Sequence, residues 1–400
     1  MSTSPSSASP LLIFTLILST ALGPFAMSSF LPAIPEIQEE FLTSSSVAQL
    51  TMTVSMLSMG IFALFYGTLA DRHGRRPVLL IGVAIAFFGS VACAFAPTIE
   101  WAIIGRALQA GGATSGMILT RVIVHDIYGD KRTASMLGYI TASMTIAPVI
   151  GPVAGGFMIE ELNWRYIFYC IAALALVLWL AIAITLPETK PDGLVADERL
   201  VPIDDYTALV SNVDVRNYLI FTGLSQSTFM AFLGGVPFLV AVYFDLPASV
   251  YGLLILPVPL GFGIGGLLAG RYADKIDHYR LVVMSAWTAV LAVVISLLLV
   301  TLVWDSPWAI CLPTGFVALA IALGSPAAQT QIMSAAGEHS GSASGLTSFI
   351  QLVFGAIVAQ FVGWSATFGP IGVVGPMLFC ALCAAAVLSL SRRTPTVPAS

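Results

Sequence analysis

The chain has 400 residues, of which 58% are hydrophobic and 9% are charged, and its formal net charge is −5. A soluble globular chain carries about a quarter charged residues, so a water-soluble fold of this composition would expose far too much apolar surface. Nothing in this balance indicates a basic surface for nucleic acid. In lipid, only helices and closed barrels satisfy their backbone hydrogen bonds, and the long, continuous apolar runs favour helices over short alternating barrel strands.

A helix needs about 20 apolar residues to cross a bilayer, and twelve segments reach that length. In chain order they are 11–34, 47–69, 77–96, 101–122, 136–158, 165–187, 216–242, 249–270, 281–303, 308–330, 342–365 and 370–390. We expect an all-α polytopic membrane protein with twelve transmembrane helices. The five cysteines all fall in these segments, without the arrangement of a metal site, and we interpret them as small apolar packing residues.

Basic residues set the orientation, because Lys and Arg prefer the cytoplasmic side. With both termini cytoplasmic, the loops and tail on that side receive nearly all of them, and the opposite side receives only Arg165. This asymmetry supports the count of twelve and predicts a multi-pass protein of the inner (cytoplasmic) membrane.

The connections divide the chain at a single long polar stretch. Residues 188–215 are acidic and connect an N-terminal six-helix bundle (1–187) to a C-terminal one (216–400). Because anionic lipid attracts Lys and Arg rather than acids, we interpret this stretch as a solvated cytoplasmic tether.

A short charged turn at 67–76 joins the second and third segments, and a weaker copy at 266–275 occupies the same place in the second half. The pair indicates a duplication, and the turn resembles the cytoplasmic loop signature of the major facilitator superfamily of secondary transporters. The resemblance implies two pseudo-symmetric six-helix bundles, and a gating contact from Asp71 to the helix that starts near Gly341–Gly345. The alternative is that Asp71, Arg72, Arg75 and Arg76 only anchor the topology.

Charged residues inside or at the end of the fourth segment are the next candidates. Arg106 lies within the segment, where an arginine costs about 2.5–3.5 kcal/mol, so we expect it to face the bundle interior or a watered cavity. Its context, Gly105–Gly112, resembles a family signature whose arginine is tied to proton coupling; the alternative is a structural arginine. For Arg121 and Asp126 we expect a charge network in which Arg72 or Arg75 pairs with Asp126.

The fifth segment combines small residues at four-residue spacing, which let helix backbones touch, with prolines that bend the helix. Its run of Pro148, Gly151, Pro152, Gly155 and Gly156 resembles the signature of antiporters, and Asn163–Phe168 adds to the match. Together with Leu31–Pro35, these features are most similar to the drug:proton antiporter branch of the bicyclomycin and chloramphenicol resistance (Bcr/CflA) type.

The sequence departs from that branch at Ser28, where many relatives carry an aspartate that binds protons or cations. No acidic residue falls inside a predicted segment, although a buried carboxylate is the usual device for proton coupling. Coupling is then left to Glu36, Asp71, Asp126 or a titratable substrate, or it is absent. Without a cavity carboxylate, a neutral or anionic substrate is favoured, with Arg106 as a fixed donor.

Side chains that suit an adaptable cavity come from both halves. They are Met27, Ser28, Phe30, Thr114, Met117, Tyr139, Met144, Gln226, Phe229, Met230, Gln329 and Gln351. We expect a monomeric, cofactor-free, non-enzymatic transporter in the lipid bilayer that exports small amphipathic molecules in exchange for protons. No phosphate-binding loop is present in the sequence, which argues against the use of ATP. The alternatives are a dedicated metabolite exporter or facilitator without proton coupling, and a non-transporting receptor or scaffold.

Overall fold

The computed structural model describes residues 10–191, 203–272, 275–303, 306–337 and 340–390. Within these ranges the side chains of 129–135, 137–139, 141–143, 145, 303, 340–341 and 390 are outside the description, and the predicted cavity residue Tyr139 is among them. Over the described residues the chain forms helices joined by short connections, without strands.

The first half contains six labelled α-helices and one short 3₁₀ turn. They are α1 (Pro10–Phe30), the 3₁₀ turn η1 (Leu31–Ala33), α2 (Ile34–Glu40), α3 (Ser45–His73), α4 (Arg75–Ala94), α5 (Ile99–Glu161) and α6 (Arg165–Thr185). The second half consists of α7 (Ile203–Ser211), α8 (Val213–Phe238), η2 (Leu239–Tyr243), α9 (Ala248–Leu254), α10 (Pro257–Tyr272), α11 (His278–Leu298), η3 (Leu299–Val303), α12 (Trp308–Ala336), α13 (Ser340–Ser365), η5 (Ala366–Phe368) and α14 (Pro370–Leu390).

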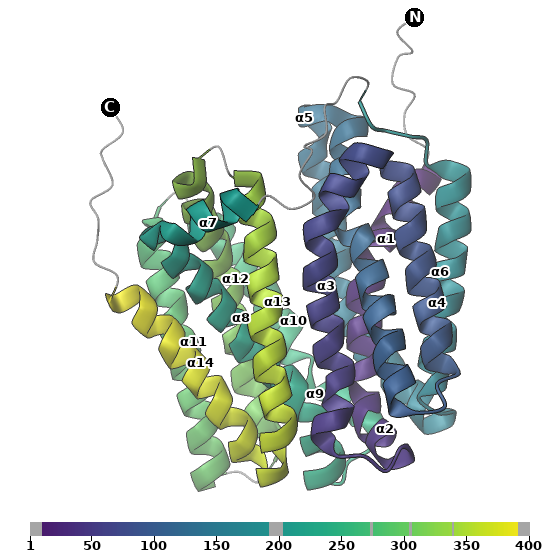
Figure 1. Cartoon of the computed structure of the whole chain (residues 1–400). Coiled ribbons are helices and arrows are strands. Elements are labelled where there is room, and N and C mark those ends of the chain that lie inside the picture. The colour runs from purple at the N-terminus through teal and green to yellow at the C-terminus, as the bar shows by residue number, and fades with distance from the viewer. Residues whose placement is uncertain (1–9, 192–202, 273–274, 304–305, 338–339, 391–400) are drawn as a thin grey trace, which may run out of the picture.

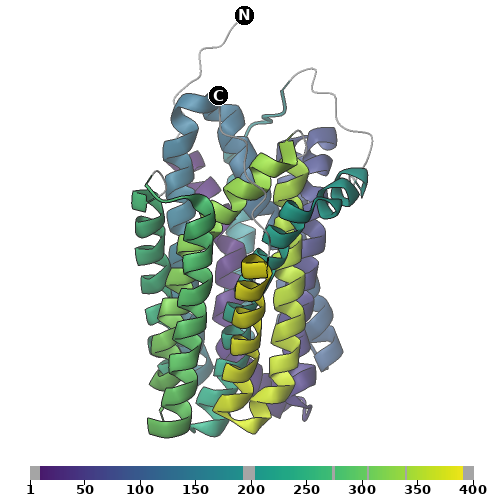
Figure 2. The same cartoon turned by 90° about the vertical axis from the view of Figure 1, so that its left-hand side faces the viewer.

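Helix α5 covers both the fourth and the fifth predicted segments. A straight helix of its 63 residues would be about 95 Å long, against a bilayer core of about 30 Å. Arg106 and Gly151, however, both contact α1 within residues 26–29. The helix therefore folds back on itself, as Figure 2 shows at its top, and supplies two passes.

The predicted fold class is confirmed. Ten helical stretches in the described part of the chain are long and apolar enough to cross a membrane, and the two arms of α5 bring the number of passes to twelve. The helices form two bundles that stand side by side (Figure 1), one from each half of the sequence. Backbones approach closely where glycines face each other's helices: Gly89 of α4 and Gly112 of α5 both lie against the partner helix's backbone.

The linker differs from the expected tether, because part of it is a helix. In α7, Leu209 is 3% exposed and belongs to an apolar cluster with Val215 and Leu346, while Ser342 of α13 donates a hydrogen bond to Asp205 (2.7 Å). Asn212 then caps α8 by accepting from two of its first backbone N–H groups. An apolar face on a short acidic segment was therefore enough to dock it on the second bundle.

Two ends of the molecule are named below by their residues. The basic end, at the top of Figure 1, is the end with the α3–α4 turn, which contains Arg72, Arg75 and Arg76, and with α7. The Trp164 end, at the bottom, is the end with α2, the α5–α6 turn and the start of α9.

Candidate functional site: a cavity between the bundles

A cavity of about 570 Å³ lies between the two bundles, within the range of drug-sized ligand sites. The first half contributes residues of α1, η1, α3 and both arms of α5, and the second half contributes residues of α8, α10, α13 and the α9–α10 connection. The lining is Pro24, Met27, Ser28, Leu31, Met56, Met59, Arg121, Met144, Pro148, Gln226, Phe229, Met230, Leu233, Ile255, Val258, Pro259, Phe262 and Leu352.

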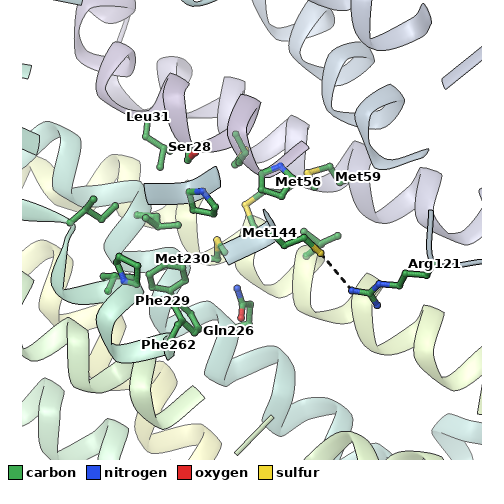
Figure 3. A pocket seen from close by; sticks show the side chains of 18 residues that line it. Ser28, Leu31, Met56, Met59, Arg121, Met144, Gln226, Phe229, Met230 and Phe262 are labelled. Atoms are coloured by element: carbon green, nitrogen blue, oxygen red, sulfur yellow. Dashed lines mark hydrogen bonds between the residues drawn. The ribbon is translucent and has the colours of Figure 1, made fainter. Parts of the chain in front are cut away.

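The lining is apolar apart from three side chains (Figure 3). Ser28 and Gln226 are neutral, and Arg121 is the one charged member among the described lining residues. Five methionines supply flexible, polarizable walls that adapt to different solutes, and Phe229 meets Phe262 edge-on, with ring centroids 5.4 Å apart. The surface suits an apolar body of variable shape.

The structure brings six of the twelve predicted cavity residues together in this lining: Met27, Ser28, Met144, Gln226, Phe229 and Met230. Five others lie outside this lining: Phe30, Thr114, Met117, Gln329 and Gln351. Helix α1 covers the α5 residues among them, because Met117 lies against Gly23 and Thr114 is 3% exposed. Gln329 is exposed on α12, and Gln351 is half-buried on α13 outside the cavity lining.

Arg106 is buried inside the first bundle, with 1% of its surface exposed. Its guanidinium donates to Ala26 O (3.3 Å) and Gln109 Oε1 (2.5 Å), and lies 4.2 Å from the centre of the Phe30 ring. A third donor reaches the Met27 sulfur at 3.4 Å. Arg106 thus stands behind the cavity wall rather than in it, so the expected direct donation to substrate is not made in this conformation.

The proline- and glycine-rich arm of α5 packs against two different neighbours. A side chain at Gly151 or Gly155 would collide with Ser28 or Ser29 of α1, inside the same bundle. At Gly156 a Cβ would lie 2.7 Å from the Ala248 carbonyl oxygen, across the boundary in the second bundle. Pro148 lines the cavity, while Pro152 is buried in the same arm. Gly155 therefore packs inside its own bundle, whereas the next residue, Gly156, packs against the other bundle.

Hydrogen bonds join the two bundles at the Trp164 end. Gln360 of α13 donates to Ser46 O (2.8 Å) and accepts from Thr53 Oγ1 (2.8 Å), both in α3. A second connection between the bundles is made by Ser249 of α9, whose backbone N–H donates to Glu160 Oε1 of α5 (2.9 Å). The bundles are therefore closed at this end, while Arg121 at the opposite side of the cavity is exposed.

Glu36 also lies at the Trp164 end, outside the cavity lining. It is half-buried against the backbone of Trp164, and its Oε2 is buried without a hydrogen-bond partner in the described part of the chain. Beside it, Glu40 accepts from Trp164 Nε1 (2.5 Å) and Arg165 Nη1 (2.7 Å). Glu36 is thus separated from the cavity residues.

A charge cluster forms at the basic end. Of the two expected partners of Asp126, Arg75 makes the pair, at 3.2 Å from Nε to Oδ2, and the same guanidinium also pairs with Asp71. Arg76 donates to Ala183 O (2.6 Å), and the backbone oxygen of Arg72 accepts from Lys190. The contacts described for Asp71 thus lie within the turn, and the start of α13 contacts Asp205 instead.

Gly74 and Glu188 fasten this turn to the end of α6. Gly74 has φ +102° and ψ 153°, a region essentially restricted to glycine, and a Cβ there would collide with the Glu188 carboxylate. That carboxylate accepts from the backbone N–H groups of Arg75 (2.8 Å) and Arg76 (3.3 Å). It therefore caps the N-terminus of α4, where the helix dipole favours an anion.

The carboxylate of Glu188 predicts a measurable stability effect. Partial burial raises its pKa, but hydrogen bonds from the backbones of Lys190, Arg75, Thr189 and Arg76 outweigh burial and leave the pKa below its usual value. We expect Glu188→Ala to lower stability by about 1 kcal/mol near pH 7, as loss of a cap does. A lowered pKa in the folded state stabilises above the unfolded value of about 4.3, and this contribution disappears as pH falls through the lowered value.

Thermal unfolding in detergent at pH 7 and at pH below 4 measures this difference. Glu39→Ala, which removes an exposed carboxylate of α2, is the control. A gap between wild type and Glu188→Ala that stays constant at both pH values would contradict the capping role of the charge.

Twelve of the eighteen described lining residues were not predicted as cavity residues from the sequence. Several apolar lining residues belong to no distinctive motif, among them Met56, Met59, Phe262 and Leu352. An apolar residue in a membrane span has the same sequence pattern whether it faces lipid or a cavity. For Arg121 the sequence predicts a charge network, and the structure places this side chain in the cavity lining. The available signal was the position of Arg121 fifteen residues after Arg106 on the same predicted span, where a charged side chain is expected to face the bundle interior or a watered cavity.

Two bundles of membrane-spanning helices around a central cavity that is closed at one end define a secondary transporter. The chain belongs to the Major Facilitator Superfamily, whose sequence profile matches residues 16–359. It is 26% identical over 367 residues to the uncharacterized MFS-type transporter YdgK of Bacillus subtilis, covering 91% of each chain. It is 26% identical over 261 residues to multidrug resistance protein D of Escherichia coli (strain K12), covering 65% of each chain.

Solved structures agree on the fold. A bacterial homologue of the human lysosomal transporter Spinster, in an inward-facing and unoccupied conformation, superposes with a TM-score of 0.74 at 16% identity, covering 96% of this chain and 97% of that one. A peptide transporter POT in complex with sulfate gives 0.76 at 15% identity, with 94% and 93% covered. The protein is a multi-pass membrane transporter of small molecules.

Proposed function

We propose that the protein exports small amphipathic molecules by alternating access, in exchange for protons, as a member of the Bcr/CflA-type drug antiporters. The observation that carries this proposal is the adaptable, methionine-rich cavity at the interface of the bundles. Similarity to multidrug resistance protein D and to MdtL of Escherichia fergusonii, at 28% identity over 226 residues and 56% of each chain, supports the substrate class.

The distribution of basic residues supports one orientation of the protein in the membrane. The basic end carries Arg72, Arg75, Arg76 and Lys190, and by the preference of basic residues for the cytoplasm it faces inward. Both termini then lie in the cytoplasm of a cell whose inner membrane holds the protein. A cavity closed at the Trp164 end would in that orientation accept substrate from the cytoplasm, which is the loading state of an exporter.

A facilitator without proton coupling is the second candidate, and one observation favours it. The eighteen described residues that line the cavity include no carboxylate. For antiport, the proton carrier must then be Glu36, Asp71, Asp126 or the substrate itself. The two candidates share alternating access and differ in the driving force.

Efflux from vesicles separates the two candidates. The purified protein is reconstituted into proteoliposomes, and the vesicles are loaded with a panel of fluorescent drugs and dyes. A pH gradient and a membrane potential are then imposed separately. Efflux that follows the pH gradient and collapses with a protonophore supports antiport. Efflux that ignores the pH gradient overturns antiport and leaves the facilitator, whereas absence of flux for the whole panel overturns multidrug export.

Asp71 tests the gating role of the basic end. Arg75 has a side chain only 6% exposed and shares its guanidinium between Asp71 and Asp126, so Asp71→Asn leaves a largely buried cation with one carboxylate. We expect turnover to fall about tenfold, corresponding to about 1.4 kcal/mol, with substrate affinity within about twofold. Stopped-flow efflux and equilibrium binding on the same preparation measure both, and Glu39→Gln is the control. An unchanged rate would reduce the turn to a topology anchor.

A further inference from the structure

Arg121 is the one charged side chain among the described residues that line the cavity. It projects from the first arm of α5 toward the second arm, where Nη2 lies 3.8 Å from the Met144 sulfur (Figure 3). A thioether is a weak acceptor. Among the described residues no carboxylate lies within salt-bridge distance of Arg121, so in this part of the chain no ion pair neutralises its guanidinium.

The surroundings of Arg121 give it influence over the whole cavity. Apart from Ser28 and Gln226, every other described lining residue is apolar, and charges interact more strongly next to low-dielectric walls than in water. Ser28 is already turned toward the Phe25 and Ala147 backbone oxygens, at 3.2 and 3.5 Å. Gln226 then remains as a neutral group that can accept or donate.

Arg106 cannot play this part, although it is a second cation in the same helix. It is 1% exposed, its donors reach Ala26, Gln109 and Met27, and Phe30 covers its face. The two arginines thus divide two tasks: Arg106 ties α5 to α1 behind the wall, and Arg121 faces the space that a solute would enter.

We infer that the transported molecule is an amphipathic organic anion, whose carboxylate or similar planar anionic group binds the Arg121 guanidinium while its apolar body lies among Met56, Met230, Phe229 and Phe262. The inference rests on the proposed function and specifies its substrate class. A planar fork of donors matches a carboxylate bidentately. An organic cation would meet the like charge of Arg121 and find no carboxylate in the lining.

A matched set of probes tests the charge preference. The probes are 2-naphthoate, 2-naphthamide and 2-naphthylmethylammonium, which share one ring system and carry charges of −1, 0 and +1. Isothermal titration of purified full-length protein in detergent measures their binding. We expect the naphthoate to bind at least about tenfold more tightly than the amide, equivalent to about 1.4 kcal/mol, and the ammonium compound to bind most weakly.

Variants assign the preference to Arg121. Arg121→Gln should bring the naphthoate to the affinity of the amide, and Arg121→Lys should keep the order with a smaller margin, because the ammonium group lacks the fork. Arg271→Gln, which removes an exposed arginine at the end of α10 outside the cavity lining, should leave all three affinities unchanged. If Arg121→Gln does not fold, Gln226→Glu offers the reverse test: a carboxylate in the same lining should shift the preference toward the ammonium probe.

Several outcomes would overturn the inference. They are equal binding of the three probes, tightest binding of the ammonium compound, retention of the anion preference in Arg121→Gln, and no measurable binding of any probe to folded protein. A cation preference would leave efflux driven by the pH gradient untouched, so the proposed function would survive it. Conversely, anion binding without any flux in proteoliposomes would retain the site and overturn the transport proposal.

Discussion

Arg106→Ala should abolish transport, with turnover at least about 100-fold lower, while the protein still folds and inserts. Hydrogen bonds from a charged donor contribute about 1.5–3 kcal/mol each, and Arg106 donates two, to Ala26 O and to Gln109 Oε1. Through Ala26 and Met27 it fixes the stretch of α1 whose next residues line the cavity. Without this tie, movement of α5 is no longer passed on to the cavity wall.

We expect Arg106→Ala to fold, because among the described residues Arg106 has no buried anionic partner that the substitution would leave unpaired. Among the described residues, Arg106 is partnered by a carbonyl, an amide, a thioether and aromatic rings. Removing one member of a buried ion pair is strongly destabilising, but here the substitution removes an arginine that costs about 2.5–3.5 kcal/mol to place in the membrane. Arg106→Met keeps the apolar stem and should be equally inactive.

Efflux from proteoliposomes, membrane expression and the thermal midpoint in detergent test this prediction together. Arg106→Lys retains the charge without the planar fork and should recover only part of the activity. Full activity of Arg106→Ala would remove this residue from the mechanism, and loss of folded protein in Arg106→Met would show that the role is structural.

Gly156→Leu should arrest the transport cycle by keeping the Trp164 end open. A Cβ at this position would lie 2.7 Å from the Ala248 carbonyl oxygen and 3.0 Å from Ser249 Cα, both backbone atoms of the other bundle. Backbone cannot yield as a flexible side chain does, and overpacking costs about 1–3 kcal/mol, which shifts a two-state equilibrium by about 5–150-fold. The state seen here, with the bundles joined at that end, becomes the disfavoured one.

Cysteine labelling reads out this shift directly. Thr53→Cys places a thiol at the joined end, next to Gln360, and its reaction with a water-soluble maleimide should accelerate in the Gly156→Leu background while efflux is lost. Gly266→Leu is the matched control, because a Cβ there meets nothing within 4 Å. Gly155→Leu should instead reduce the yield of folded protein, since that glycine lies against Ser29 of its own bundle. Unchanged labelling and normal efflux in Gly156→Leu would contradict the proposed interface.

Both predictions concern residues that the sequence had already singled out, but for reasons that the structure refines. The repeated small residues on the fifth segment predicted close helix contact, and close contact is what Gly151 and Gly156 make. Their spacing could not tell that one contacts its own bundle and the other contacts the opposite bundle. Spacing fixes the face of a helix on which residues lie, whereas the neighbour of that face depends on how the helices assemble.

The sequence by itself determined the solvent, the element type and the number of passes. Only 9% charged residues and apolar runs of membrane length leave helices as the form that satisfies the backbone in lipid. These are local properties, because each segment satisfies its own hydrogen bonds. The interior position of Arg106 also follows from the sequence, because exposing a charged side chain to hydrocarbon costs free energy whatever its neighbours are.

The tertiary structure alone decided which of two arginines faces the cavity and what fastens the charged turn. Arg106 and Arg121 are both cations on one helix, and α1 covers the first while leaving the second open. Glu188 reaches Gly74 across more than a hundred residues, and Gln226 joins Met27 in one wall from the opposite bundle. Hydropathy is a property of each segment, but the rotation of a helix about its axis is set by packing against its neighbours, and that is information no single segment contains.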